Sequence, residues 1–114
     1  MTERLFWYNT VTVVAAATAL SLYDLVTDTS LDYALPANLP GQCVSLNFIS
    51  DTAIKVGGTA AELDDTHGGT LAANTAFQDS ATGAGGNTIP LGQVYVYAPT
   101  GSNATLTIYL RFIG

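Results

Sequence analysis

The chain has 114 residues and a formal net charge of −6, with three basic and nine acidic residues. Its length predicts one domain with one modest core, and its three cations, Arg4, Lys55 and Arg111, are too few to bind nucleic acid directly. A single cysteine, Cys43, excludes an internal disulfide.

The N-terminus carries a short aromatic run. Residues 1–9 are predicted to form an N-terminal arm that precedes the first strand. Within this arm, Phe6, Trp7 and Tyr8 are candidate docking residues, because terminal segments are usually disordered unless they dock on something, and Tyr and Trp are enriched at interfaces.

The next segment changes its periodicity twice. Residues 10–14 are rich in β-branched side chains and predict a strand. Residues 14–20 are alanine-rich and compatible with a helix, whereas the period-two pattern of residues 20–23 favours a second strand. The apolar stretch 11–26 is short, is interrupted by polar residues and carries an aspartate, so it is not predicted to span a membrane.

The middle of the chain predicts a β-hairpin. Apolar and polar residues alternate from Cys43 to Phe48, and residues 50–52 supply a turn. A three-residue loop would place Phe48 opposite Ile54 and Leu46 opposite Val56, so that the apolar side chains share one face.

Residues 57–88 contain most of the glycines and form a loop-rich segment. Leu71 and Phe77 are expected to anchor short strands there, and residues 59–65 are compatible with one helical turn. Long loops in compact domains tend to be functional or disordered.

The C-terminal third predicts a second hairpin. Residues 93–98 and 104–112 alternate strictly between apolar side chains and polar or tyrosine side chains, and residues 99–103 have turn composition. A five-residue loop would pair Val96 with Leu106 and gather the aliphatic side chains on one face. The opposite face of this hairpin would collect Tyr95, Tyr97, Thr105, Thr107, Tyr109 and Arg111.

Short strands separated by Gly, Pro and Asn indicate an all-β protein. We expect a single domain, residues 1–114, built as an antiparallel β-sandwich of seven or eight strands. Both a jelly-roll-like and an immunoglobulin-like arrangement fit this pattern.

The sequence offers little for catalysis. His67 and Cys43 are the only residues of their kinds, and nothing in their spacing brings them together. Glu62, Asp64, Asp65 and His67 are the only dense group of metal-ligand types, but the spacing of a calcium-binding loop is absent, which favours a solvated acidic loop. No catalytic residue, cofactor or metal is therefore predicted.

The surface of the protein must be largely neutral, because only 11% of the residues are charged. Such a surface suits burial against partner subunits, where charges are costly to desolvate. Tyr95, Tyr97 and Tyr109 then have three interpretations: the core of a subunit interface, with Arg111 beside them; a platform that stacks on sugar rings; or side chains covered by the long loop. The interface interpretation is favoured.

Several short motifs resemble the small β-sandwich structural proteins of tailed bacteriophages. These are residues 10–13 with 15–22, the strand 42–46, the strand 54–58, residues 69–71 and residues 94–96 of the final hairpin. The resemblance covers most of residues 10–110. The chain departs from the family pattern at residues 74–77, where a tight Pro-Gly turn is usual, and in the added Gly-rich stretch 80–88.

The resemblance implies a non-enzymatic virion protein. Members of this family serve as capsid decoration (cement) proteins or as tail, neck or baseplate components. By the same resemblance, the chain would be made in the host cytoplasm and would reside in the virion. We expect it to form a homo-oligomer, such as a trimer, and to bind the major capsid protein or other virion proteins.

Overall fold

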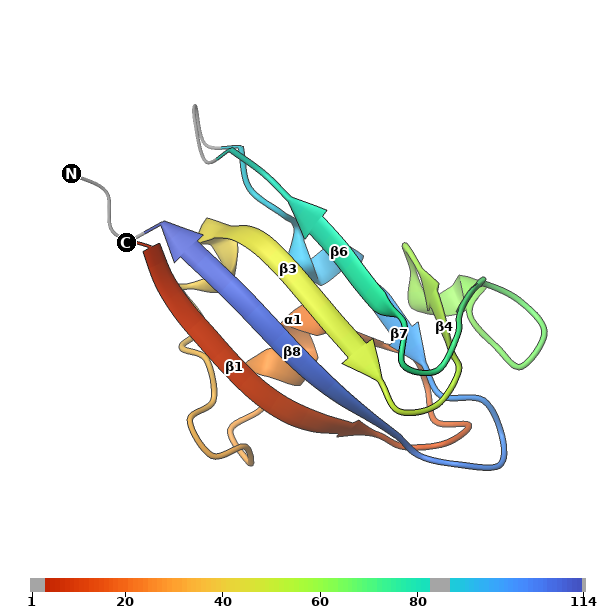
Figure 1. Cartoon of the computed structure of the whole chain (residues 1–114). Coiled ribbons are helices and arrows are strands. Elements are labelled where there is room, and N and C mark those ends of the chain that lie inside the picture. The colour runs from red at the N-terminus through yellow and green to blue at the C-terminus, as the bar shows by residue number, and fades with distance from the viewer. Residues whose placement is uncertain (1–3, 83–86, 114) are drawn as a thin grey trace.

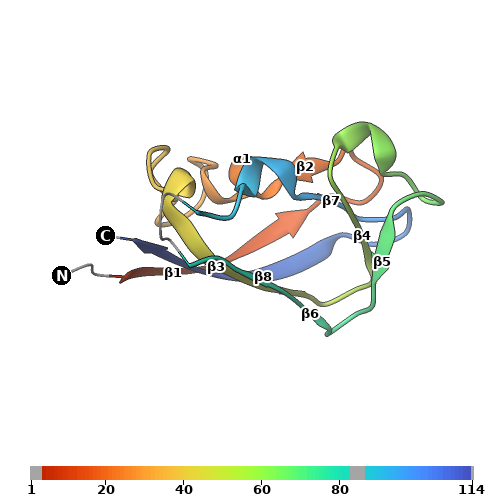
Figure 2. The ribbon, with the colours of Figure 1, turned by 90° about the horizontal axis from the view of Figure 1, so that it is seen from above.

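Two antiparallel sheets form the body of the protein. The computed structural model describes residues 4–82 and 87–113. Its strands are β1 (Arg4–Val13), β2 (Leu20–Ser21), β3 (Cys43–Ser50), β4 (Ile54–Gly57), β5 (Gly69–Leu71), β6 (Ala76–Ser80), β7 (Tyr95–Tyr97) and β8 (Ala104–Ile113). The front sheet has the order β1-β8-β3-β6, and the back sheet has the order β2-β7-β4-β5. Figure 1 shows the front sheet face-on, and Figure 2 shows the two layers.

The strand order identifies the sandwich as a jelly roll. Each strand pairs with the strand that occupies the mirror position in the chain: β1 with β8, β2 with β7, β3 with β6 and β4 with β5. Eight strands wound in this way into two sheets form the jelly-roll architecture. The predicted all-β sandwich is therefore confirmed, and the topology selects the jelly roll over the immunoglobulin-like alternative.

The two predicted hairpins are wrong. β7 lies in the back sheet and β8 in the front sheet, so Val96 pairs with Leu20 and Val56, whereas Leu106 pairs with Val11 and Ser50. Likewise β3 belongs to the front sheet and β4 to the back sheet. The apolar faces of both sheets point into the same core, so alternation identified the buried face of each strand but not its partner.

The predicted N-terminal arm is also wrong for residues 4–9. β1 begins at Arg4 and pairs with β8 along its whole length, from Arg4 opposite Ile113 to Val13 opposite Ala104. Residues 1–3 of the predicted arm lie outside the described residues. The final strand is ten residues long, and the N-terminal segment supplies the partner that satisfies its backbone hydrogen bonds.

The strand predicted over residues 20–23 is replaced by a shorter strand and a helix. β2 ends at Ser21, whose Oγ accepts a hydrogen bond from the Asp24 backbone N–H at 3.1 Å and caps helix α1 (Leu22–Val26). Leu22, Leu25 and Val26 are buried at helical spacing. Residues 14–20 form no helix; instead the Ala16 N–H bonds the Ala98 carbonyl.

The loop-rich segment contains the short elements expected of it. β5 and β6 include Leu71 and Phe77, and a 3₁₀ turn occupies Ala60–Glu62. Two more 3₁₀ turns, at Pro40–Gln42 and Leu91–Gln93, lead into β3 and β7. Residues 83–86 of the predicted Gly-rich loop lie outside the described residues.

The hydrophobic core fills the space between the sheets. Alternate residues of β3 and β8 are fully buried, and α1 covers the part of the core that the short β2 leaves open (Figure 2). Phe48 of β3 and Phe77 of β6 stack with their ring centroids 4.9 Å apart. None of the described helices has the length and apolar character needed to cross a membrane.

Candidate functional site

The outer surface of the front sheet carries a cluster of exposed aromatic residues. In β1 the side chains of Val11 and Val13 are buried, so the alternate residues Phe6 and Tyr8 point outward. In β8 the same alternation directs Tyr109 outward. The strand register then places Tyr8 directly opposite Tyr109. The pairing of β1 with β8 thus brings together residues from the two ends of the chain.

The rings of this cluster contact one another. The centroids of Tyr8 and Tyr109 are 4.9 Å apart with the planes tilted by 40°, and those of Phe6 and Tyr109 are 6.2 Å apart with a tilt of 35°. Arg111, opposite Phe6 in the register, places its Cζ atom 5.1 Å from the Phe6 centroid, within the range of a cation–π interaction. We call these four residues, Phe6, Tyr8, Tyr109 and Arg111, the aromatic face.

The aromatic face is exposed although its members pack together. The relative exposures are 54% for Phe6, 51% for Tyr8 and 38% for Tyr109. Its surroundings on the front sheet are neutral, because the next outward positions along β1 and β8 are threonines and those of β3 are Ser45, Asn47 and Ile49. Among the described outward side chains of β1, β3 and β8, Arg111 is the only charged one. The face therefore lacks carboxylates although the whole chain is acidic.

The remaining candidate interface residues lie elsewhere. Trp7 is partly buried against the core, and its Nε1–H donates to the carbonyl of the exposed residue Tyr33 at 2.9 Å. Tyr95 and Tyr97 lie on β7 of the back sheet, so the predicted grouping of Tyr95, Tyr97 and Tyr109 on one face is wrong. Tyr97 is buried against Ala19 and Leu63.

Sequence reasoning missed the proximity of Phe6 and Tyr8 to Tyr109. The sequence does contain the alternation of apolar inward residues that would extend the first strand toward the N-terminus, at Val13 and Val11. Asn9 interrupts this alternation, because it is a polar residue at the next inward position. The structure explains this residue, because the Asn9 Nδ2 group donates to the Asp32 carbonyl at 2.7 Å. An inward amide with a partner is compatible with a strand that faces the core.

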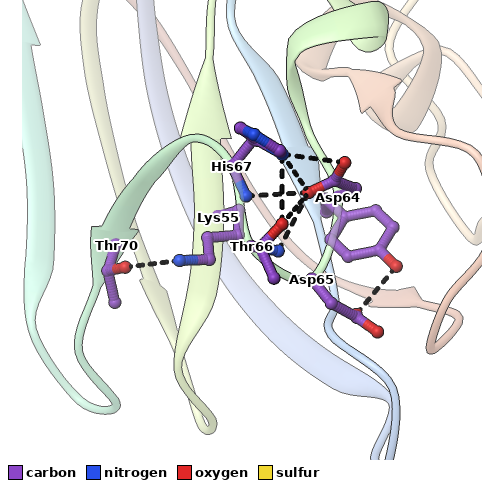
Figure 3. A network of polar contacts seen from close by, with 7 residues as sticks. Lys55, Asp64, Asp65, Thr66, His67 and Thr70 are labelled. Carbon is purple, nitrogen blue, oxygen red and sulfur yellow. Dashed lines mark hydrogen bonds and ion pairs between the residues drawn. The ribbon is translucent and has the colours of Figure 1, made fainter.

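The acidic loop, residues 63–68, forms a second polar cluster (Figure 3). Asp64 Oδ1 accepts hydrogen bonds from the backbone N–H groups of Thr66 and His67, at 2.9 and 2.8 Å, and contacts His67 Nδ1 at 2.8 Å. These donors, above all the Thr66 N–H, lower the pKa of Asp64 to about 2. The loop is thus organised around one carboxylate.

The neighbouring Asp65 links this loop to the β7–β8 connection. Its carboxylate accepts from the Thr100 backbone N–H at 2.9 Å, from Thr100 Oγ1 at 2.7 Å and from the Tyr97 hydroxyl at 2.9 Å. The Thr100 bonds are the main reason that the pKa of Asp65 is lowered. The raised pKa of Tyr97 reflects its burial first and its bond to Asp65 second. The contacts are those of a structural clamp between two loops.

The acidic loop does not assemble a metal site or a nucleophile. No three His, Cys, Asp or Glu side chains converge in the part of the chain that the structure describes. Glu62 instead accepts from Thr59 Oγ1 at 2.8 Å. Cys43 is buried in β3, and burial raises the pKa of its thiol to about 11, which leaves it protonated at neutral pH.

The clamp predicts a loss of stability in acid. The pKa values of Asp64 and Asp65 in the folded protein lie below the ordinary value of 3.8, so their contribution to stability is fully present above about pH 5. It is lost as the pH falls through the lowered pKa values, of which that of Asp64 is about 2. We expect the thermal midpoint of the wild type to fall more over this interval than that of the Asp65→Asn variant, as measured by circular dichroism. An equal fall in both proteins would contradict the role of Asp65.

Of the two clusters, the aromatic face has the properties of a binding surface. Its rings are exposed, its neighbours are neutral, and its only described cation is stacked on a ring. The carboxylates of the acidic loop already have partners, because Asp64 bonds Thr66 and His67 within the loop and Asp65 bonds Tyr97 and Thr100. No protein-family model matches the chain, and no match is found among curated proteins or among solved structures.

Proposed function

We propose that the chain is a non-enzymatic structural subunit of a bacteriophage particle, a capsid decoration protein that bridges neighbouring capsid subunits. The observation that supports this proposal is the aromatic face on an otherwise neutral sheet. Burial of aromatic surface yields about 25 cal/mol per Å², and the absence of carboxylates among the described outward side chains of β1, β3 and β8 avoids a desolvation cost. The choice of a phage particle rests on the sequence resemblance.

The aromatic face is suited to protein contact. Aromatic and arginine side chains dominate the energetics of protein interfaces, and Tyr8, Tyr109 and Arg111 are of these types. Because the rings already pack together and Arg111 already stacks on Phe6, little side-chain freedom remains to be lost on binding. Jelly rolls occur in viral capsid proteins, and also in lectins, so the fold alone does not decide the function.

A carbohydrate-binding module is the alternative that exposed tyrosines on a sheet would suggest. The rings of Tyr8 and Tyr109 are tilted by 40° and pack against each other, so they do not form a flat platform. Binding across a glycan array that disappears in the Tyr109→Ala variant would favour this alternative. Tyr97, which the sequence suggested for such a platform, is buried.

The location of the chain in purified particles tests the proposal. Particles produced from a genome that encodes the chain are analysed by mass spectrometry and cryo-microscopy. We expect many copies distributed over the capsid shell. A few copies at one vertex would move the protein to the tail, neck or baseplate, and particles without the chain would overturn the proposal.

The binding residues are tested on particles stripped of the chain. We expect Tyr109→Ala to weaken rebinding about tenfold, because central aromatic residues act as hot spots. Tyr23→Ala is the matched control: Tyr23 is 36% exposed against 38% for Tyr109, but it lies on α1 behind the front sheet. Equal affinity of the two variants would exclude the aromatic face as the binding surface.

A further inference from the structure

β1 is an unusually long edge strand. Of the four strands at the sheet edges, β1 has ten residues, β6 has five, β5 has three and β2 has two. Natural proteins protect long edges with lysine, proline, bulges or inward charges. β1 has no Lys or Pro, its register with β8 is regular over all ten pairs, and its only charged residue is the first, Arg4.

The backbone of β1 presents hydrogen-bonding groups along this edge. The backbone N–H of Thr10 donates to the side-chain Oδ1 of the preceding residue, Asn9, and not to a carbonyl of β8. The backbone groups of Thr10 therefore point away from the sheet. Thr105, opposite Thr12, directs its own N–H and C=O toward Asp51 after β3, so Thr12 also faces the open edge. In an antiparallel pair, every second residue turns its backbone N–H and C=O away from the paired strand, so Phe6 and Tyr8 also direct these groups toward the open edge.

No neighbouring segment occupies this edge in the described structure. The loop that follows α1 lies in the layer of α1, above the plane of the front sheet in Figure 2. Trp7 and Asn9 attach it through their side chains. Among the described residues, the backbone of β1 makes no hydrogen bond outside β1 except with β8.

Tyr33, on this loop, provides a second and independent observation. It is 91% exposed, and its φ is +61°, a conformation that is an outlier for a bulky residue. Its carbonyl accepts the Trp7 Nε1–H bond, which places the residue beside β1. Backbone strain of this kind persists where the surrounding structure holds it and clusters at functional contacts, which directs attention to the loop beside the open edge.

We propose that a second copy of the chain pairs with this edge, β1 against β1 in antiparallel orientation about a twofold axis. The two front sheets then form one continuous sheet of eight strands. The inference rests on the proposed function, because it names the first partner of the assembly subunit. A twofold contact of this kind closes as a dimer, in contrast to the trimer suggested by the sequence.

A second copy fits this edge better than an unrelated strand does. An antiparallel pair of identical strands is self-complementary, and residues 5–13 contain no charge, so no like charges face each other across the axis. Pairing also sets Phe6 and Tyr8 of the two copies side by side on the same outer surface. The two aromatic faces become one continuous band, which increases the area available to a capsid partner.

Two substitutions at Tyr8 separate the edge from the face. Tyr8→Pro removes the outward N–H and blocks pairing, and proline is tolerated on edge strands where that group faces solvent. Tyr8→Ala keeps the N–H and removes only the ring. By analytical ultracentrifugation we expect the wild type and Tyr8→Ala to have twice the chain mass of 11.8 kDa, and Tyr8→Pro to be monomeric.

Hydrogen exchange on the wild type gives a readout that does not depend on a variant. We expect the amides of Phe6, Tyr8 and Thr12 to exchange about tenfold more slowly when the concentration is raised above the dimer dissociation constant. The Gln78 amide on the β6 edge is the control and should not respond. A wild-type monomer at all concentrations, or a Tyr8→Pro dimer, would overturn the inference.

Failure of this inference is distinguishable from failure of the proposed function. A dimer that is lost in Tyr8→Pro, together with particles that lack the chain, would leave the edge pairing in place and reject the virion role. A monomer that binds stripped particles through Tyr109 would support the virion role and reject the edge pairing. An edge occupied by an extended segment of another virion protein would also reject the pairing of two copies.

Discussion

We expect Phe48→Ala to lower the free energy of unfolding by about 3–5 kcal/mol. Phe48 is fully buried between the two sheets, lies opposite Ile108 of β8 and stacks on Phe77 of β6. Removing its ring leaves a cavity where three strands of the front sheet meet, and the backbone ladders on both sides of β3 limit the collapse of that cavity. Urea denaturation followed by circular dichroism measures the change.

Phe6→Ala is the matched control for the loss of a phenyl ring. Phe6 lies in the same sheet but is 54% exposed, so its replacement should cost about 1 kcal/mol or less. The Phe48→Ala and Phe77→Ala variants should also be non-additive by about 0.5–1.5 kcal/mol, because their rings touch. Equal costs at Phe48 and Phe6 would show that the burial assigned to β3 is incorrect.

The second large effect is expected at Gly68. Its φ is +110°, and a Cβ atom there would lie 2.5 Å from Leu63 Cδ2 and 3.3 Å from Lys55 Cβ. Gly68→Ala therefore combines backbone strain with displacement of the buried Leu63 side chain, and we expect it to lower the free energy of unfolding by about 2–5 kcal/mol. Chemical denaturation provides the measurement.

Three other glycines separate the two causes. Gly101 has a φ of +124°, and a Cβ atom there would have no other atom within 4 Å, so Gly101→Ala tests strain alone, at about 1–2 kcal/mol. Gly57→Ala tests the contact alone, because its Cβ would lie 2.7 Å from Leu63 Cδ2. Gly58 has neither feature and should accept alanine at no cost. If Gly68→Ala were no costlier than Gly101→Ala, Leu63 would not be held as tightly as the structure indicates.

The candidate site was only partly accessible from the sequence. Phe6, Tyr8, Tyr109 and Arg111 were each singled out, but the sequence placed the first two on a separate arm and the last two beside Tyr95 and Tyr97. Their actual grouping depends on β1 pairing with β8. That pairing joins the two ends of the chain, and no local pattern specifies so distant a partner.

Local alternation determined which side chains are buried. Val96, Leu106, Ile108, Leu110 and Phe112 all point into the core as the sequence predicted, because a strand with one apolar face must bury that face whichever strand lies next to it. Only the tertiary structure decided which strands are neighbours. The short loop between β7 and β8 can close a hairpin, but at about 3.3 Å per residue it can equally cross the roughly 10 Å between two packed sheets. The chain crosses, because both sheets then share one core, and this choice places the aromatic face on β1 and β8.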